Sequence, residues 1–392
     1  MRPGDLSVLH IAGPDMALRL PSILQLKQRG VQVHAAGSGS SQPFDDVGVP
    51  FYPYELNGSA SPLADRKTNV ALAEIIREVK PHVVHSFSTK PCVLVPPVAR
   101  MLDVPVNLRT VCGLGHLYSS NSLKAKLMRI PFLAYHRRAS RTADMTIFQN
   151  EDDWNLFREK SVVRNDNSML IPGSGVDITG LAEQIPNQSQ RAQLREEMRA
   201  SDGPIVMMVA RLVRAKGVDL FLESARTIRK EHPEATFVLV GPLAKNGRGI
   251  PLSTIESYSD DVTYLGYRKD IPALLSMADI FALPSQYREG VPRVLMEAAA
   301  LGLGLVTTNM PGCKDVVINE ETGLRIEPGD QQALNVATTR LIESPSLRAE
   351  LGSRALARIR DRFEVSHVVD SYINTYSNIL GQPITTPTRK AA

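Results

Sequence analysis

Apolar residues are distributed along this chain in two alternating patterns. Short apolar runs are separated by longer stretches in which apolar residues recur every three or four positions. Because side chains repeat about every two residues in strands and about every 3.6 in helices, the runs predict strands and the stretches predict helices. In the first half, strands are predicted at 6–12, 31–36, 82–86, 104–111 and 145–149. This alternation is typical of βαβ units, in which helices cover both faces of a parallel sheet.

The same alternation begins again in the second half, where strands are predicted at 205–210, 236–241, 262–265, 280–283 and 305–308. The predicted fold class is therefore α/β, with two doubly wound, Rossmann-like domains whose strands end at a shared cleft. Residues 171–177 are predicted to be the hinge, because a proline ends the strand there and two glycines permit unusual backbone angles. The expected domains are 1–172 and 173–363.

The end of the chain carries one more helical pattern and then a polar segment. Residues 364–380 place Val365, Tyr372 and Tyr376 among the apolar side chains on one side of a helix. Residues 381–392 are rich in proline and threonine, which predicts a disordered tail.

Composition narrows the class of protein further. With 392 residues, of which 43% are hydrophobic and 22% charged, the chain resembles ordinary globular proteins of about two to three domains. Apolar runs stay below the length of about 18 residues that a membrane span needs, and charged residues occupy the N-terminal segment where a secretory signal would be apolar. The three cysteines are widely spaced and form no CxxC pair, which argues against a disulfide framework or a structural zinc site. A cytoplasmic location is expected.

The charge is unevenly distributed along the chain. The net charge of +4 is small for this length and does not imply a nucleic-acid partner. Residues 1–172 nevertheless hold 20 basic against 15 acidic residues, and 104–143 contains no acidic residue. Within it, Leu123, Leu127 and Ile130 recur at helical spacing among basic residues, which predicts an amphipathic basic helix. Such a helix suits an anionic membrane surface or a phosphate-bearing ligand; the alternative is a surface helix with a solvated cationic face.

Residues 283–297 carry the most informative chemistry. A strand end leads into a helix that is predicted to begin at Pro292, since proline suits the first helical turn. The amides of Gly290, Val291 and Arg293 would then face an anion such as a phosphate, which the helix dipole favours.

Two glutamates frame this segment. Glu297 lies among apolar residues of the predicted helix, so its carboxylate needs a partner, and a vicinal diol such as a ribose would offer two hydroxyl donors. Glu289, in the preceding loop, is expected to hold a second polar group of the ligand. The alternative is that Glu297 forms a structural ion pair with an arginine or lysine and that Glu289 is solvated.

Two cations, Arg211 and Lys216, follow the predicted strand 205–210. Beside a helix N-terminus they could neutralise a diphosphate without a metal, each contributing about 2–4 kcal/mol. The sequence has no Asp-x-Asp, and its aspartate doublets are better explained as caps or turns. HExxH, GxxxxGK[ST] and GxGxxG are absent, which argues against zinc proteases, P-loop enzymes and standard dinucleotide binding. We therefore expect neither a metal nor a cofactor.

These residues also resemble a known family. Glu289 and Glu297 form E-x7-E, with Pro284-Ser285 before them; the segments 209–212, 216–217, 311–317 and 319–323 complete the pattern. Together they resemble the donor-binding half of glycosyltransferase family 4, which are retaining enzymes of the GT-B fold. Residues 85–91, 110–115 and 148–153 resemble the capsule, O-antigen and lipid-linked-oligosaccharide branch of that family. The resemblance spans residues 5 to about 380.

The resemblance implies a role for each matching residue. Arg211 and Lys216 would hold the nucleotide diphosphate, Glu297 the ribose and Glu289 the hydroxyls of the donor sugar. The backbone of Gly290, Val291 and Pro292 would cradle the phosphate, Gly266, Tyr267 and Arg268 would contact the base, and Gly13 would approach the sugar phosphate. The final helix, 364–380, would return to the first domain. The donor implied is a UDP-sugar, with an N-acetylhexosamine favoured, and retention would follow from front-face attack.

An acceptor site is expected in the first domain, at Ser88, Thr89, Lys90, Cys112, Gly113, His116 and Asn150. Cys112 stands where other branches have histidine, and the nearby His116 is a substitute candidate. The basic segment 124–141 suggests a polyprenyl-diphosphate-linked glycan acceptor and a peripheral position on the inner face of the cell membrane, with a soluble acceptor as the alternative. Two other functions remain open: a nucleotide-sugar 2-epimerase and a non-catalytic sugar-nucleotide-binding subunit.

Overall fold

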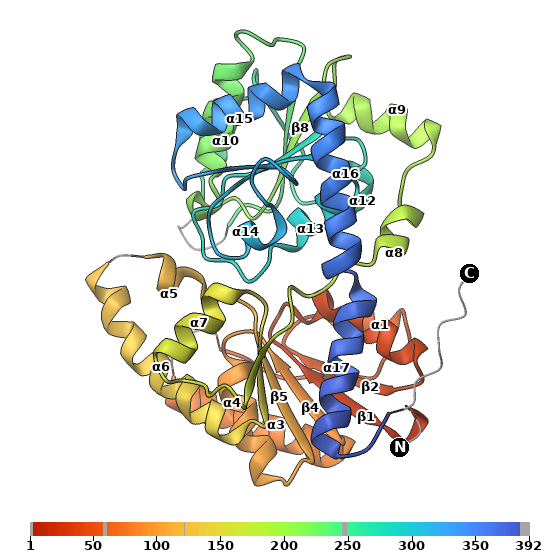
Figure 1. The fold of residues 1–392 in the computed structure, drawn as a ribbon, viewed down its shortest axis with the longest axis vertical. Helices are drawn as coiled ribbons and strands as arrows, with labels where there is room; N and C mark the ends of the chain where they lie inside the picture. The colour runs from red at the N-terminus through yellow and green to blue at the C-terminus, as the bar shows by residue number, and fades with distance from the viewer. Residues whose placement is uncertain (1–2, 58–60, 121, 245–248, 385–392) are drawn as a thin grey trace. The chain divides into compact units, whose positions relative to one another are not determined.

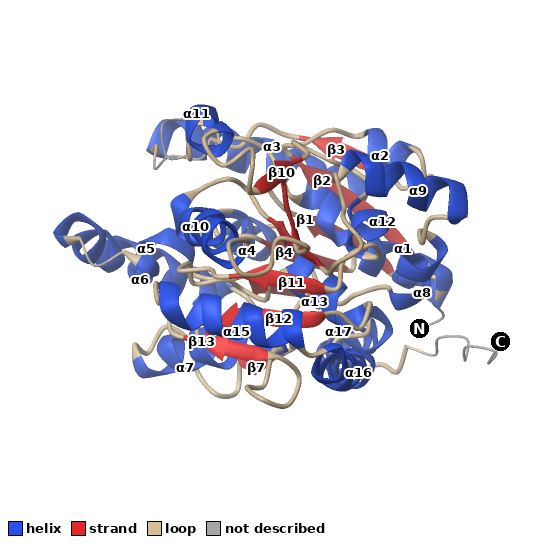
Figure 2. Ribbon diagram, turned by 90° about the horizontal axis from the view of Figure 1, so that it is seen from above, coloured by secondary structure: helices blue, strands red, loops and turns tan. Residues whose placement is uncertain are grey.

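The computed structural model describes residues 3–57, 61–120, 122–244 and 249–384. The chain forms two compact units, one of Met1–Gly175 with Val365–Ala392 and one of Val176–Glu364 (Figure 1). Each unit has a parallel sheet, in the order β3-β2-β1-β4-β5-β6-β7 in the first and β10-β9-β8-β11-β12-β13 in the second. Figure 2 shows the strands lying between helices. The predicted α/β class with two doubly wound domains is confirmed.

The strands of the first unit are β1 (Ser7–Ile11), β2 (Gln32–Gly37), β3 (Phe51–Pro53), β4 (Val83–Phe87), β5 (Val106–Val111), β6 (Met145–Phe148) and β7 (Ser168–Leu170). Its helices are η1 (Pro3–Asp5), η2 (Met16–Arg19), α1 (Leu20–Gln28), α2 (Gln42–Asp45), α3 (Pro62–Val79), α4 (Pro91–Met101), α5 (Gly115–Ser119), α6 (Leu123–Thr142), α7 (Glu151–Glu159) and α17 (Val365–Leu380).

The strands of the second unit are β8 (Ile205–Val209), β9 (Thr236–Val240), β10 (Val262–Tyr264), β11 (Ile280–Leu283), β12 (Gly304–Thr308) and β13 (Leu324–Ile326). Its helices are α8 (Ile178–Glu183), α9 (Gln188–Glu197), η3 (Arg214–Lys216), α10 (Val218–Ile228), α11 (Leu252–Glu256), α12 (Ile271–Leu275), α13 (Arg293–Ala300), α14 (Cys313–Val316), α15 (Gln331–Glu343) and α16 (Pro345–Arg362).

Every strand predicted from the apolar runs is present. The described residues also contain β3 and β13, which the pattern did not predict, and β7, of which only the end before Pro172 was predicted. Each has three residues and lies at the edge of its sheet. β10 is equally short and also lies at an edge but was predicted at 262–265, so length alone does not account for the omission.

Alternate residues of β1 face two different helical layers. Val8 packs in the cluster that contains residues of α1 and α17, whereas Leu9 and Ile11 pack in the cluster formed with α3 and α4. This is the two-residue period expected of a strand that is buried on both faces.

The last helix, α17, belongs to the core of the first unit and lies beside α1 (Figure 1). Its Tyr372 and Tyr376 are buried, and Tyr376 Oη lies 2.8 Å from His85 Nδ1 in β4. Ile384 is buried in the same cluster, so Gly381–Ile384 are folded and the predicted disordered tail does not begin at 381. Residues 385–392 lie outside the described part of the chain.

Helix α6 contains the basic segment and presents an apolar stripe outward. Ala125, His136, Ala139 and Ser140 are its buried residues. Leu123, Leu127 and Ile130, by contrast, are 74%, 59% and 68% exposed. Among the described residues, every helix is too short or too polar to cross a bilayer.

Candidate active site

The loops after β8 and β11 meet in the second unit, because these strands are parallel neighbours. Gly217 ends the first loop with a φ of +76°, and a Cβ at this position would lie 2.1 Å from Pro284 O in the second. Only glycine permits both this backbone angle and this approach. The loops that carry Lys216 and Glu289 are therefore held in contact.

Lys216 and Glu289 form an ion pair across these loops. Lys216 Nζ donates a hydrogen bond to Glu289 Oε1, and Ser285 Oγ donates to the same oxygen at 3.1 Å. The two side chains are 15% and 11% exposed. Lys216 Nζ also lies 5.6 Å from the centre of the Tyr287 ring, within the range of a cation–π interaction. Glu289 is thus largely removed from solvent, contrary to the alternative that it is solvated.

The loop after β12 supports the segment 289–292 from another side. Gly312 has a φ of +85°, and a Cβ there would lie 2.2 Å from Gly290 O. The Glu289 amide donates to Pro311 O at 3.3 Å. Burial and the charge of Glu289 raise the pKa of Cys313 to about 12, so this thiol remains protonated and packs as an apolar group. These contacts hold the backbone of Glu289 and Gly290 against the loop after β12.

Helix α13 begins at Arg293, one residue later than predicted, because Pro292 takes an extended conformation and acts as its N-cap. Arg293 Nε donates to Glu297 Oε1 at 2.7 Å, one turn along the helix. Glu297 thus has the ion-pair partner that the alternative expected. Its role toward a ribose stays a prediction.

The remaining donor-site candidates differ in how they are held. Arg211 is exposed, and its side chain has no hydrogen bond or ion pair to any described residue. Gly266 has a φ of +68° with open space where a Cβ would lie, and Tyr267 is 66% exposed. Arg268 pairs with Asp270 and with Glu197, each at 2.6 Å, which raises the pKa of the guanidinium. Arg211 and Tyr267 are therefore accessible to a ligand, whereas Arg268 is engaged by the protein.

The acceptor candidates follow β4, β5 and β6, which are neighbours in the first sheet. Thr89 is exposed and Gly113 has a φ of +110°. Lys90 pairs with Asp65 at 2.6 Å, and Asn150 is buried as the N-cap of α7. The side chain of His116 lies outside the described part of the structure.

Ser88 and Cys112 belong to one polar cluster at this edge. Ser88 Oγ lies 2.8 and 2.7 Å from the two carboxylate oxygens of Asp15. The guanidinium of Arg19 donates to Cys112 Sγ at 3.4 Å and lies 3.8 Å from Asp15. Asp15 and Arg19 were not among the predicted site residues; their position soon after β1 is the one signal in the sequence that points to them.

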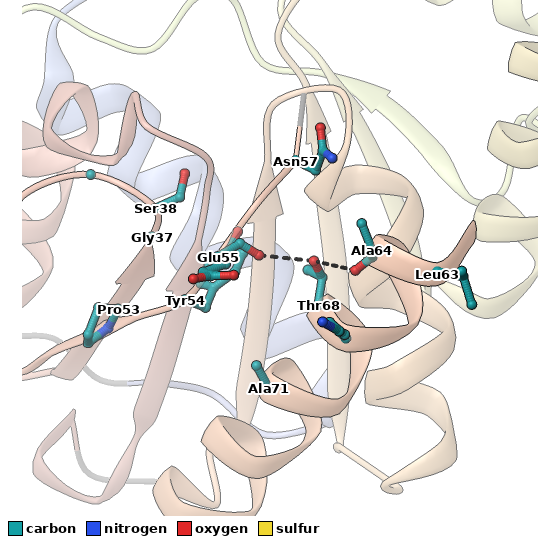
Figure 3. Close-up of a pocket in the computed structure, with 12 residues that line it drawn as sticks. Gly37, Ser38, Pro53, Tyr54, Glu55, Asn57, Leu63, Ala64, Thr68 and Ala71 are labelled. Atoms are coloured by element: carbon teal, nitrogen blue, oxygen red, sulfur yellow. Dashed lines mark hydrogen bonds between the residues drawn. The ribbon is translucent and has the colours of Figure 1, made fainter. Parts of the chain in front are cut away.

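The first unit also contains a cavity of about 700 Å³ at the ends of β2 and β3, beside α3 (Figure 3). It is lined by Gly37, Ser38, Gly39, Pro53, Tyr54, Glu55, Asn57, Leu63, Ala64, Lys67, Thr68 and Ala71. Thr68 Oγ1 lies 2.9 Å from Glu55 O, which ties α3 to the strand end. The candidates chosen from the sequence are absent from this lining, because its residues come from separate segments that share no motif.

Two protein-family models match the chain. The model described as glycosyl transferase 4-like domain matches residues 23–173, and the model described as glycosyl transferases group 1 matches 189–358. A similar relative is the N,N'-diacetylbacillosaminyl-diphospho-undecaprenol alpha-1,3-N-acetylgalactosaminyltransferase of Campylobacter jejuni, which is 28% identical over 97% of this chain and 99% of the relative. Another is the Escherichia coli UDP-Gal:alpha-D-GlcNAc-diphosphoundecaprenol alpha-1,3-galactosyltransferase, 26% identical over 86% of this chain and 85% of the relative.

Solved structures share the two-unit fold. Anabaena HepE in complex with UDP is 19% identical with a TM-score of 0.77, covering 95% of this chain and 100% of HepE. Sucrose-phosphate synthase from Thermosynechococcus elongatus is 19% identical with a TM-score of 0.78, covering 96% of this chain and 99% of the synthase. At this level of identity the similarity shows the fold alone.

Proposed function

We propose that this chain, which belongs to the family 4 glycosyltransferases of the GT-B fold, transfers an N-acetylhexosamine from a UDP-sugar to a hydroxyl of an undecaprenyl-diphosphate-linked glycan. The Lys216–Glu289 pair carries the proposal, because it joins a cation to the carboxylate that we expect to bind the donor sugar, and both residues lie within the segment that matches the group 1 model. The names of the Campylobacter and Escherichia relatives both contain an undecaprenol-diphosphate acceptor, which supports the lipid-linked acceptor. The Campylobacter name supports the N-acetylhexosamine, and the Escherichia name supports UDP.

In the proposed reaction, the acceptor hydroxyl attacks the anomeric carbon from the side of the leaving group. The new glycosidic bond forms as the bond to the UDP oxygen breaks, and the hydroxyl proton passes to that diphosphate. Lys216 and Arg211 would stabilise the negative charge that develops on UDP, with help from the N-terminus of α13. Glu289 would hold the sugar hydroxyls, and front-face attack would retain the anomeric configuration.

The proposal includes independence from divalent metal. The Lys216 and Arg211 charges would take the part that a metal ion plays in other transferases. We expect turnover in excess EDTA to stay within about twofold of turnover with added Mg²⁺, because removing the metal removes no stabilisation of the transition state. A tenfold fall in rate would correspond to about 1.4 kcal/mol of lost transition-state stabilisation. Product formation measured in both buffers checks this, and a loss of activity that Mg²⁺ restores would contradict it.

The function itself is tested with UDP-GalNAc, UDP-GlcNAc and UDP-Gal, each with and without an undecaprenyl-diphosphate-linked sugar, followed by mass spectrometry. Addition of one sugar to the lipid supports the transferase. Interconversion of UDP-sugars without lipid would support the 2-epimerase. Donor binding with no product in any mixture would support the non-catalytic subunit.

The exposed stripe of α6 supports a peripheral position on an anionic membrane. Leu123, Leu127 and Ile130 are exposed, and Lys124 and Lys126 lie between them in the sequence. An apolar stripe flanked by lysines matches helices that lie in the headgroup region. This position would bring the enzyme to a lipid-linked acceptor.

Replacing Leu127 and Ile130 together by aspartate is expected to weaken binding to phosphatidylglycerol vesicles by about tenfold or more. Full burial of each apolar side chain stabilises binding by about 1.5–3 kcal/mol, and about 1.4 kcal/mol corresponds to tenfold in affinity. Vesicle sedimentation measures the change. Val336→Asp in α15, also at an exposed apolar residue, is the matched control. Equal binding by the double variant and the control would refute the role of α6.

A further inference from the structure

A carboxylate in the first unit belongs to a polar cluster at the ends of the neighbouring strands β1, β4 and β5. Asp15 follows β1; it contacts Ser88, which follows β4, and Arg19, whose guanidinium donates to Cys112 after β5. The Asp15 side chain is 34% exposed, whereas that of Arg19 is 7% exposed. The carboxylate is therefore fixed on the protein side and open to solvent on the other.

Ser88 is in an unusual conformation at this contact. Its φ of +66° lies in the left-handed region, which non-glycine residues seldom adopt. Such conformations persist where the surroundings impose them, and they cluster at functional sites. Here the hydroxyl of Ser88 contacts both oxygens of Asp15, at 2.8 and 2.7 Å.

The second residue that contacts Asp15 is Arg19, whose guanidinium lies 3.8 Å from the carboxylate. Its guanidinium carbon lies 5.1 Å from the centre of the Phe87 ring, and its side chain is almost fully buried. Phe87 ends β4 immediately before Ser88. Arg19 and Ser88 thus fix Asp15 from two sides and restrict the orientation of its carboxylate.

The cavity of Figure 3 adjoins the same loop. A Cβ on Gly37 would lie 3.2 Å from Gly13 O, and one on Gly39 would lie 3.1 Å from Pro14 O. The wall of the cavity therefore packs on the backbone that leads directly to Asp15. A glycan bound at this edge of the sheet would have both a fixed carboxylate and a cavity beside it.

We propose that Asp15 accepts a hydrogen bond from a hydroxyl of the acceptor sugar and so orients the acceptor for attack. An ionised carboxylate only accepts hydrogen bonds, which matches a ligand rich in hydroxyl donors. Ser88 and Arg19 are positioning residues in this arrangement. The assignment rests on the proposed transferase function, and it adds a determinant that acts on the acceptor and not on the UDP-sugar.

The test compares Asp15→Asn with the unmodified enzyme, using UDP-sugar and the undecaprenyl-diphosphate-linked acceptor. The amide keeps the shape of the side chain but loses the charge of the acceptor oxygens. We expect kcat/KM for the acceptor to fall about 10- to 100-fold, as for loss of a charged hydrogen bond. The KM for the donor and the rate of donor hydrolysis by water should be unchanged. Asp103→Asn, at an exposed position of the same unit, is the control.

Ser88→Gly supplies a second measurement, because glycine accepts the left-handed conformation while removing the hydroxyl. It should lower acceptor kcat/KM by a smaller factor, with donor hydrolysis again unchanged. Unchanged acceptor kinetics in Asp15→Asn would overturn the assignment and leave the transferase function intact. A parallel loss of donor hydrolysis and melting temperature would also overturn it, in favour of a structural role. If the unmodified enzyme transfers no sugar to any acceptor, the transferase function fails and the assignment falls with it.

Discussion

Replacement of Lys216 by alanine is expected to lower kcat by about 100- to 1000-fold, the range observed when one preorganised charge-stabilising donor is lost. The Lys216 side chain is 15% exposed, and its ammonium group is paired with Glu289 beside the Tyr287 ring. Its charge would act most strongly as the diphosphate departs. Single-turnover measurements with saturating donor separate this loss from weaker donor binding.

Lys216→Ala also removes the ion-pair partner of Glu289. A second variant must therefore show whether the fall in kcat comes from the lost cation or from the unpaired carboxylate. Lys216→Ala combined with Glu289→Gln contains no uncompensated carboxylate. Glu289→Gln alone measures the loss that comes from the carboxylate, and if the cation stabilises the leaving group, the double variant is slower than Glu289→Gln. Recovery of activity in the double variant would show instead that the unpaired carboxylate caused the defect. Lys230→Ala, at an exposed position of the same unit, is the control for general effects.

The substitution Gly217→Ala is expected to lower the free energy of unfolding by about 2–5 kcal/mol, the sum of left-handed strain and overpacking. Its Cβ would overlap Pro284 O at 2.1 Å, so the loops after β8 and β11 must separate. That separation would displace the neighbouring Lys216, and a shift of about 1 Å in a catalytic group costs about 100-fold in rate. Urea denaturation and product formation measure the two effects.

Gly302→Ala is the matched control for this prediction. Gly302 has a φ of +73°, close to the +76° of Gly217, but the nearest atom to its Cβ would be Gly352 O at 3.8 Å. The control therefore carries the left-handed strain without the overlap, and should cost about 1–2 kcal/mol with near-normal activity. Equal stability and equal activity of the two variants would show that the close approach of the loops has no importance.

The architecture could be predicted from the sequence because it depends on local periodicity. Five strands in each sheet follow from apolar runs, and the boundary between Gly175 and Val176 falls inside the segment predicted as a hinge. The direction in which the α6 stripe faces could not be predicted. Leu123 and Leu127 have the spacing of a buried face, and only tertiary packing leaves them exposed.

The candidate site was predictable as a set of residue types, but not as a set of contacts. The motifs selected Lys216, Glu289 and Glu297, yet the pairing of Lys216 with Glu289 joins residues 73 positions apart. Asp15 was overlooked for a similar reason: its partner Ser88 is equally distant in sequence, and their contact depends on the order of β1 and β4 in the sheet. Sequence spacing reports neighbours along a helix or strand, whereas a site at strand ends depends on topology.

The position of α17 constrains how the protein is made. Residues 1–175 leave the ribosome first, but the helix that covers one face of their sheet comes after the entire second unit. The second unit is continuous in sequence and has its own core, so it can fold as soon as it emerges. Until Leu380 has been synthesised, the apolar side chains around Val8 lack their cover and are available to chaperones. The first unit can therefore be completed only after the second unit has been synthesised, although its sheet is translated first.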